Sequence, residues 1–162
     1  IAVFDNSDGV AIWQNYMFEN GGLAIDLGAD GITANDVGDF DEGANRLQNT
    51  PVIESIFYDE MANPKTITIG YRVDSNNSVS TYPLHIDFYW SGLDLNSQGR
   101  HFLGTDVNYT TQNALKMVTF NFDDAAGGLV TATALDQERN TSEMSDQFQF
   151  GILDIIFKDG FE

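Results

Sequence analysis

The stretches Thr66-Ile67-Thr68-Ile69 and Val118-Thr119-Phe120-Asn121-Phe122 decide the fold. Apolar and polar residues alternate in both, as in a β-strand with one buried face. Short runs rich in β-branched and aromatic residues, separated by Asn, Asp, Gly and Ser, continue from residue 49 onward. The expected strands are residues 51–58, 66–73, 82–90, 101–109, 114–122, 129–135 and 147–150. No window has a helical period, so we predict an all-β fold, an antiparallel sandwich of the immunoglobulin type.

The chain has an ordinary globular composition and enough length for one hydrophobic core. Its 162 residues are 42% apolar and 20% charged, which is too apolar for a disordered chain. One domain with a short appendage is therefore expected. The absence of cysteine excludes disulfides and thiolate metal sites. Because the chain opens with Ile1 and lacks an initiator methionine and a signal peptide, we expect it to be a processed piece of a longer protein.

The charge is strongly negative. Seven Lys and Arg against 25 Asp and Glu give a formal net charge of −18. A field of this sign repels phosphate backbones, so nucleic acid is not an expected partner. No apolar run approaches the ~20 residues that span a bilayer, so membrane insertion is not expected either.

Residues 26–45 carry the clearest functional pattern, since carboxylates and glycines are interleaved there and the first basic residue of the chain is Arg46. Clustered carboxylates repel one another unless a cation neutralises them or water screens them. Ca²⁺ takes six to eight oxygen ligands, and glycine lets the chain bend around it. We therefore predict Ca²⁺ as a cofactor, with the candidate ligands Asp26, Asp30, Asp36, Asp39, Asp41 and Asn45. The alternative is a solvated acidic loop that uses Asx-turns and binds no metal.

The first 25 residues have a different sequence pattern from the predicted sandwich. Short β-like pieces alternate with bends at or near Asn6, Asn15 and Asn20. This pattern fits one coil of a parallel β-helix, whose stacked Asn side chains bond along the stack, or an irregular N-terminal arm. The predicted division of the chain is a terminal coil with its acidic loop at 1–48, an immunoglobulin-like sandwich at 49–150 and an apolar tail at 151–162.

The acidic segment also carries a family resemblance. The runs Ala24-Ile-Asp-Leu-Gly28, Gly31-Ile-Thr-Ala-Asn-Asp36 and Leu47-Gln-Asn-Thr-Pro-Val-Ile53, with a second match over 128–145, resemble bacterial parallel β-helix repeat surface proteins of the CSLREA type. In that family this segment closes the β-helix and leads into an immunoglobulin-like sandwich. The resemblance implies a secreted or cell-surface protein. This chain departs from the family in lacking the repeat array that normally comes first.

The C-terminal tail is too apolar to lie free in water. Its ending, Ile156-Phe-Lys-Asp-Gly-Phe-Glu162, is similar to a short signature of exported bacterial proteins, which implies an extracellular location. The tail either forms a last strand of its own sandwich or inserts into a neighbouring molecule as a donated strand. The candidate assembly residues are Ile152, Ile155, Ile156, Phe157 and Phe161.

The remaining side chains offer little chemistry. His85 and His101 both fall in expected strands, and no nucleophile elbow, phosphate loop or dinucleotide fingerprint occurs. We therefore assign no catalytic residues and do not expect an enzyme. Tyr89 and Trp90 lie in an aromatic cluster and are the candidate ligand-binding residues, either as a sugar-stacking surface or as sandwich core.

Together these patterns predict a non-catalytic extracellular module for structure or adhesion, stabilised by calcium. Its expected partners are other surface proteins or copies of itself. One alternative is a subunit of an extracellular filament assembled by strand donation. A second is a carbohydrate-binding module with a glycan as its ligand.

Overall fold

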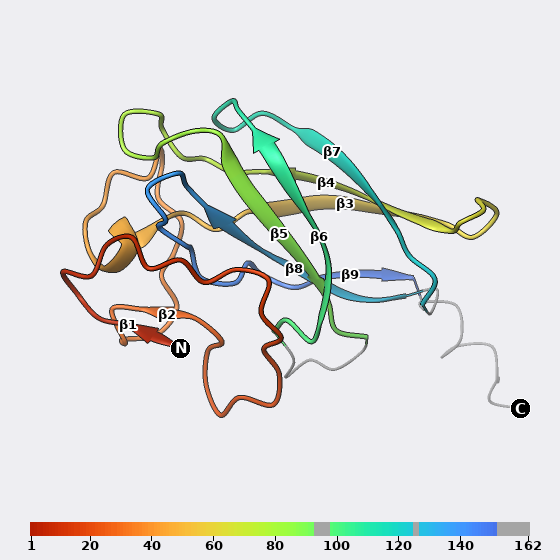
Figure 1. Cartoon of the computed structure of the whole chain (residues 1–162), viewed down its shortest axis with the longest axis horizontal. Helices are drawn as coiled ribbons and strands as arrows, with labels where there is room; N and C mark the ends of the chain where they lie inside the picture. Colours follow the sequence, from red (N-terminus) through yellow and green to blue (C-terminus); the bar gives the residue numbers. More distant parts are fainter. Residues whose placement is uncertain (93–97, 125–126, 152–162) are drawn as a thin grey trace, which may run out of the picture.

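Two antiparallel sheets face each other in the computed structural model, which describes residues 1–92, 98–124 and 127–151 (Figure 1). The first sheet has the order β3 (Val52–Asp59), β4 (Thr66–Arg72), β7 (Lys116–Asn121). The second has the order β6 (His101–Tyr109), β5 (Leu84–Trp90), β8 (Gly127–Leu135), β9 (Phe148–Gly151). These strands coincide with the runs expected from the sequence, so the predicted all-β, immunoglobulin-like sandwich is confirmed.

The main core fills the space between the two sheets. Alternate residues of β4 and β5 point inward, as the period of two requires. The fully buried side chains include Ile67, Ile69, Tyr71, Leu84, Ile86 and Phe88. Phe88 packs edge-on against Tyr71 with ring centroids 5.0 Å apart. Each such side chain stabilises the fold by roughly 1.5–3 kcal/mol.

A second, smaller core lies at the N-terminal end of the chain. Strand β1 (Ala2–Val3) pairs in parallel with β2 (Asp26–Leu27), and Ala2 is the partner of Asp26, 24 residues further along the chain. A parallel pair one turn apart is the arrangement expected of a β-helix coil. The connecting residues 4–25, all of which the structure describes, form no further strand and are here called the N-terminal arm. The buried apolar residues of this second core are Val3, Ile12, Met17, Ala24, Ile25, Leu27 and Ala44.

The N-terminal arm lies on the outer face of the four-stranded sheet and is held there by side-chain oxygens. The backbone N–H groups of Ile12 and Gln14 donate at 2.8 Å to the hydroxyl of Thr141 and the carboxylate of Asp87. Further back, the Gly9 N–H donates to the Asn140 side chain at 2.8 Å. Because the arm covers them, Asp87 and other outward-facing residues of the sheet are buried.

A buried carboxylate ties the acidic segment to the sandwich. Glu143, only 4% exposed, accepts hydrogen bonds from the backbone N–H groups of Leu27 at 2.9 Å and Thr33 at 3.0 Å. Burial raises the pKa of this carboxyl, although the two backbone donors oppose the rise. Figure 1 shows the N-terminal region gathered at one end of the sandwich, opposite the tip of the β3–β4 hairpin. None of the described residues belongs to a helix of the length and hydropathy that a bilayer crossing requires.

Candidate metal site

The acidic segment (residues 26–45) bends tightly where it meets the sandwich. Gly38 adopts a φ of 83°, in the left-handed region that favours glycine. A Cβ atom at this position would lie 2.6 Å from the ring of Phe40. The carbonyl of Gly38 accepts a hydrogen bond from the backbone N–H of Asn76 at 3.0 Å. This bend fixes the following residue, Asp39, against the loop between β4 and β5.

Three carboxylates of the segment converge. Asp36, Asp39 and Asp41 each offer one oxygen, and these atoms lie within 4.8 Å of one another. Like charges at this separation repel unless a proton or a cation neutralises them. Carboxylate oxygens are the ligands of hard cations. The three residues could hold a metal ion, and all three were among the ligands predicted from the sequence.

Asp39 is the buried anchor of the cluster. Its Oδ1 accepts from the backbone N–H of Asn49 at 2.8 Å. Its Oδ2 accepts from the Gln48 amide at 2.7 Å and from the hydroxyls of Ser75 and Ser80. Burial raises the pKa of Asp39 to about 6, even though the hydrogen bonds from Ser75, Asn49 and Ser80 lower it. Oδ2 has no capacity left for another partner, whereas Oδ1 retains a lone pair.

Asp41 is the least satisfied member of the cluster. Its Oδ1 is buried and has no hydrogen-bond partner, which is true of only one other side-chain atom, Ser91 Oγ, among the described residues. Burial raises the pKa of Asp41, and the charge of Asp36 adds to the rise. Asp36 itself accepts from the Phe40 N–H at 3.1 Å. A buried oxygen without a partner costs about 1–3 kcal/mol, so a cation at this point would relieve that cost.

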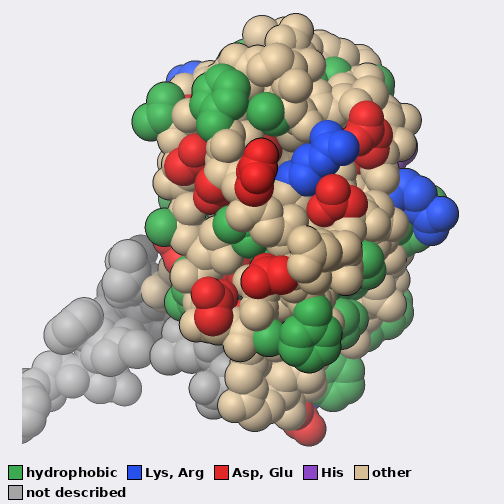
Figure 2. Space-filling view, turned by 90° about the vertical axis from the view of Figure 1, so that its left-hand side faces the viewer, with side chains coloured by type: hydrophobic (Ala, Val, Ile, Leu, Met, Phe, Trp, Pro, Cys, Tyr) green, Lys and Arg blue, Asp and Glu red, His purple; other side chains and the backbone are tan. Residues whose placement is uncertain are grey.

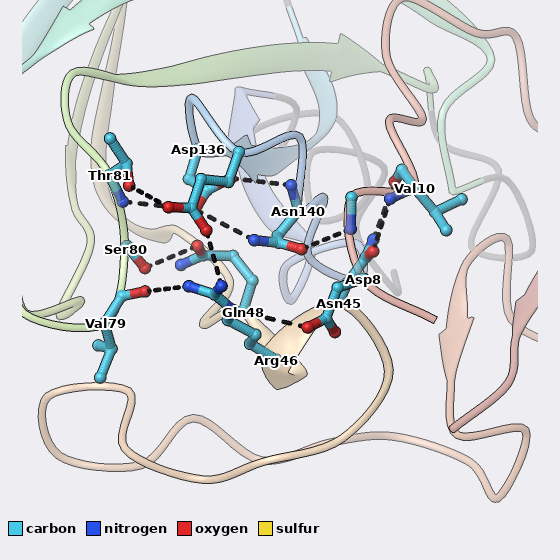
Figure 3. Close-up of polar contacts among 12 residues, drawn as sticks. Asp8, Val10, Asn45, Arg46, Gln48, Val79, Ser80, Thr81, Asp136 and Asn140 are labelled. Atoms are coloured by element: carbon cyan, nitrogen blue, oxygen red, sulfur yellow. Dashed lines mark hydrogen bonds and ion pairs between the residues drawn. The ribbon is translucent and has the colours of Figure 1, made fainter. Parts of the chain in front are cut away.

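A cavity of about 640 Å³ opens beside the cluster. Its acidic lining residues are Asp5, Asp8, Asp39, Asp41 and Glu42. The cavity also contains Arg46, which forms ion pairs with Asp8 at 3.7 Å and Glu138 at 2.7 Å and donates to the Val79 carbonyl at 3.0 Å (Figure 3). Figure 2 shows acidic side chains spread over this end of the molecule. One guanidinium does not balance this many carboxylates, so the local field attracts cations.

The other predicted metal ligands do not join the cluster. Asp26 accepts from the backbone N–H of Gly31 at 3.2 Å, and Asp30 is exposed to solvent. Asn45 is fully buried, and its amide pairs with both backbone groups of Val10 at 2.9 Å (Figure 3). The same amide donates to the Thr141 carbonyl at 3.0 Å. The left-handed φ of 48° at Asn45 belongs to the turn η1 (Ala44–Leu47). The amide of Asn45 is therefore a structural anchor, which corrects its assignment as a ligand.

The two candidate ligand-binding residues differ in burial. Tyr89 is 0% exposed and its hydroxyl donates to Asp87 at 3.3 Å. Trp90 is half-buried, donates to the Gly127 carbonyl at 3.3 Å and packs on Phe122 with ring centroids 5.5 Å apart. Of the two alternatives for this pair, Tyr89 follows the core alternative, because the N-terminal arm covers its face of β5, whereas Trp90 packs on the main core and keeps part of its surface exposed. The predicted assembly residues Ile152, Ile155, Ile156, Phe157 and Phe161 lie outside the described residues.

Sequence reasoning missed the residues that support Asp39. Gln48, Ser75 and Ser80 come from three positions up to 41 residues away from it. A single Gln or Ser in a polar loop follows no period, and nothing in the sequence distinguished these three from solvated loop residues. Comparison with known proteins adds no assignment, since no protein-family model matches the chain and the curated proteins contain no match to it.

Proposed function

We propose that this chain is a non-catalytic, extracellular structural or adhesion module whose acidic segment is held closed by a calcium ion at Asp36, Asp39 and Asp41. The observation that carries the proposal is the buried, unpartnered Oδ1 of Asp41 beside two further carboxylates. A divalent cation held by the three carboxylates would bind this oxygen and offset their mutual repulsion.

Calcium suits the cluster better than the smaller divalent cations. The donors are all oxygens, and Ca²⁺ accepts irregular sets of six to eight oxygens with water completing the shell. Mg²⁺ demands nearly ideal octahedral geometry and loses its water reluctantly. Asp39 would bind through Oδ1, because its Oδ2 already accepts three hydrogen bonds. Asp36 and Asp41 would supply oxygens that accept fewer hydrogen bonds than Asp39 Oδ2.

The contacts around Asp39 support a structural role for the ion. Ser75 and Ser80 belong to the loop between β4 and β5, and Asn49 directly precedes the sandwich. An ion at this point would therefore link the acidic segment to the sandwich. Binding to the folded state alone stabilises it by an amount that grows with the free ion concentration. A site of few ligands is expected to bind calcium in the 10⁻⁴–10⁻³ M range of extracellular calcium modules.

The test is thermal unfolding with CaCl₂ at a free concentration about ten times its dissociation constant, with MgCl₂ at the same concentration, or with a chelator. Calcium at this concentration should stabilise the folded state by about 1.4 kcal/mol. This gain raises the Tm of a domain of this size by about 3–6 °C. We expect Asp41→Asn to abolish the calcium-dependent shift. The matched control is Asp30→Asn, which removes an exposed carboxylate of the same segment that lies outside the cluster. The proposal fails if calcium gives no shift, if magnesium gives an equal one, or if the control loses as much as Asp41→Asn.

A further inference from the structure

A small pocket lies where the N-terminal arm crosses the end of the four-stranded sheet. It has a volume of about 230 Å³ and is lined by Ala11, Trp13, His85, Leu135, Asp136, Gln137 and Arg139. The arm, the first residues of β5 and the turn after β8 all contribute. Drug-sized ligands occupy roughly 300–1,000 Å³, so this pocket accommodates about one ring of a ligand. None of the three clustered aspartates lines this pocket.

The indole of Trp13 is the apolar wall of this pocket. Trp13 is 51% exposed, unlike Trp90, which packs on Phe122. An exposed Trp offers a large, rigid apolar surface at low entropic cost and a single N–H donor. Single exposed apolar residues are common. This one lines a concavity that also holds three planar polar side chains.

Arg139 brings an unpaired guanidinium to the same pocket. Across residues 1–92, 98–124 and 127–151, no carboxylate lies within ion-pair distance of it, although acids outnumber bases 25 to 7 in the chain. Its backbone φ is 75°, an uncommon conformation for a residue that is not glycine. The tight turn that imposes it is closed by the Arg139 N–H on the Asp136 carbonyl at 3.1 Å. A residue held in a sparsely populated backbone conformation motivates a hypothesis of function, and the exposed guanidinium of Arg139 is free of any carboxylate partner among the described residues.

Hydrogen bonds fix the polarity of the other two planar groups. The Nε2 of Gln137 donates to the Pro83 carbonyl at 2.7 Å, and this sets the orientation of the amide. The same nitrogen lies 3.3 Å from Nε2 of His85, and the His85 tautomer with its proton on Nδ1 can accept this contact. Gln137 Oε1 is left as an acceptor, the Arg139 guanidinium is left as a donor, and so is His85 Nδ1 in this tautomer.

From this set of groups we infer that the Trp13 pocket binds a neutral pyranose ring of a glycan. A sugar presents C–H groups to an aromatic surface and hydroxyls that donate and accept, which matches an indole flanked by two donor groups and one acceptor. An anionic ligand is repelled by the net charge of −18 and by the buried Asp136 carboxylate in the pocket wall. A cationic ligand is repelled by the guanidinium of Arg139. The site thus gives the molecule a ligand class that does not depend on the metal cluster.

The test is saturation-transfer NMR and calorimetry on the full chain with neutral gluco-, manno-, galacto- and xylo-oligosaccharides at millimolar concentration. We expect binding to at least one series, weakened roughly tenfold or more in Trp13→Ala and in Arg139→Gly. Arg139→Gly relieves the left-handed backbone, so its Tm should be unchanged or higher and loss of binding cannot be ascribed to unfolding. Tyr16→Ala is the matched control, because it removes an aromatic residue of the same arm that is 67% exposed and does not line the pocket.

Two further measurements separate this inference from the calcium proposal. Asp41→Asn and the chelator should leave glycan binding unchanged, so each proposal can fail alone. An acidic oligosaccharide series of galacturonate tests the sign of the charge. The inference is overturned if no neutral series binds, if only the galacturonate series binds, or if Trp13→Ala and Arg139→Gly bind as the unmodified chain does.

Discussion

The sandwich and the N-terminal 48 residues are stabilised in different ways. Between the two sheets, fully buried apolar side chains pack against one another, with Phe88 and Tyr71 at the centre. In the N-terminal region only one pair of two-residue strands forms, and the chain is held by side-chain oxygens and amides that bond its backbone. Asn45, Asp87, Thr141 and Glu143 perform this role. The comparison shows how a segment with few strands is ordered: buried polar side chains supply the partners that a sheet would otherwise provide.

If the main core carries most of the stability, removing one of its rings has the largest effect. Phe88→Ala should lower the free energy of unfolding by about 3–5 kcal/mol, since the side chain is fully buried and the cavity cannot collapse completely. Chemical denaturation followed by tryptophan fluorescence measures this loss. Phe57→Ala is the control: its ring is 65% exposed, and the change should stay within about 0.5 kcal/mol. Equal losses in the two variants would contradict the assignment of the core.

Removing a polar anchor should damage the N-terminal region and spare the sandwich. Asn45→Ala leaves the backbone groups of Val10 and the carbonyl of Thr141 without their partner, at a cost of about 2–3 kcal/mol. Hydrogen exchange should accelerate over residues 9–18 while β4 and β5 keep their protection.

Asn113→Ala is the matched control for this variant. Asn113 also has a left-handed backbone, with a φ of 52°, but its side chain is exposed. Both substitutions therefore carry the backbone cost of placing alanine in this conformation, and only Asn45→Ala removes buried hydrogen bonds. Similar exchange over residues 9–18 in the two variants would show that the backbone, and not the amide, holds the arm.

The same comparison explains how far the sequence could be interpreted. The strands were predictable because a period of two is local, as Thr66–Ile69 and Val118–Phe122 illustrate. The acidic segment pointed to Asp36, Asp39 and Asp41 among six candidate ligands, but their convergence depends on the bend at Gly38, whose φ is 83°. The burial of Tyr89 and the inward turn of Asn45 were not predictable. Tyr89 is covered in part by Gln14 of the N-terminal arm, which is distant in the sequence, and the direction of Asn45 depends on a left-handed turn that no periodicity records.

The pH dependence of stability tests the burial of Asp39 with the smallest expected effect. Its pKa is raised from 3.8 to about 6, so between these values the folded state binds more protons than the unfolded state, and stability falls as pH rises. In the presence of a chelator, the titration of Asp39 should lower the free energy of unfolding by about 1 kcal/mol between pH 5 and pH 7. Asp39→Asn, which cannot titrate, should lack this component when unfolding is measured at both pH values. Bound cation should weaken the dependence, because it competes with the proton for the same oxygens. If the free energy of unfolding of Asp39→Asn changed with pH as it does in the unmodified chain, the Asp39 carboxylate would be hydrated. The contact between the acidic segment and the sandwich would then be looser than the four hydrogen bonds to Asp39 imply.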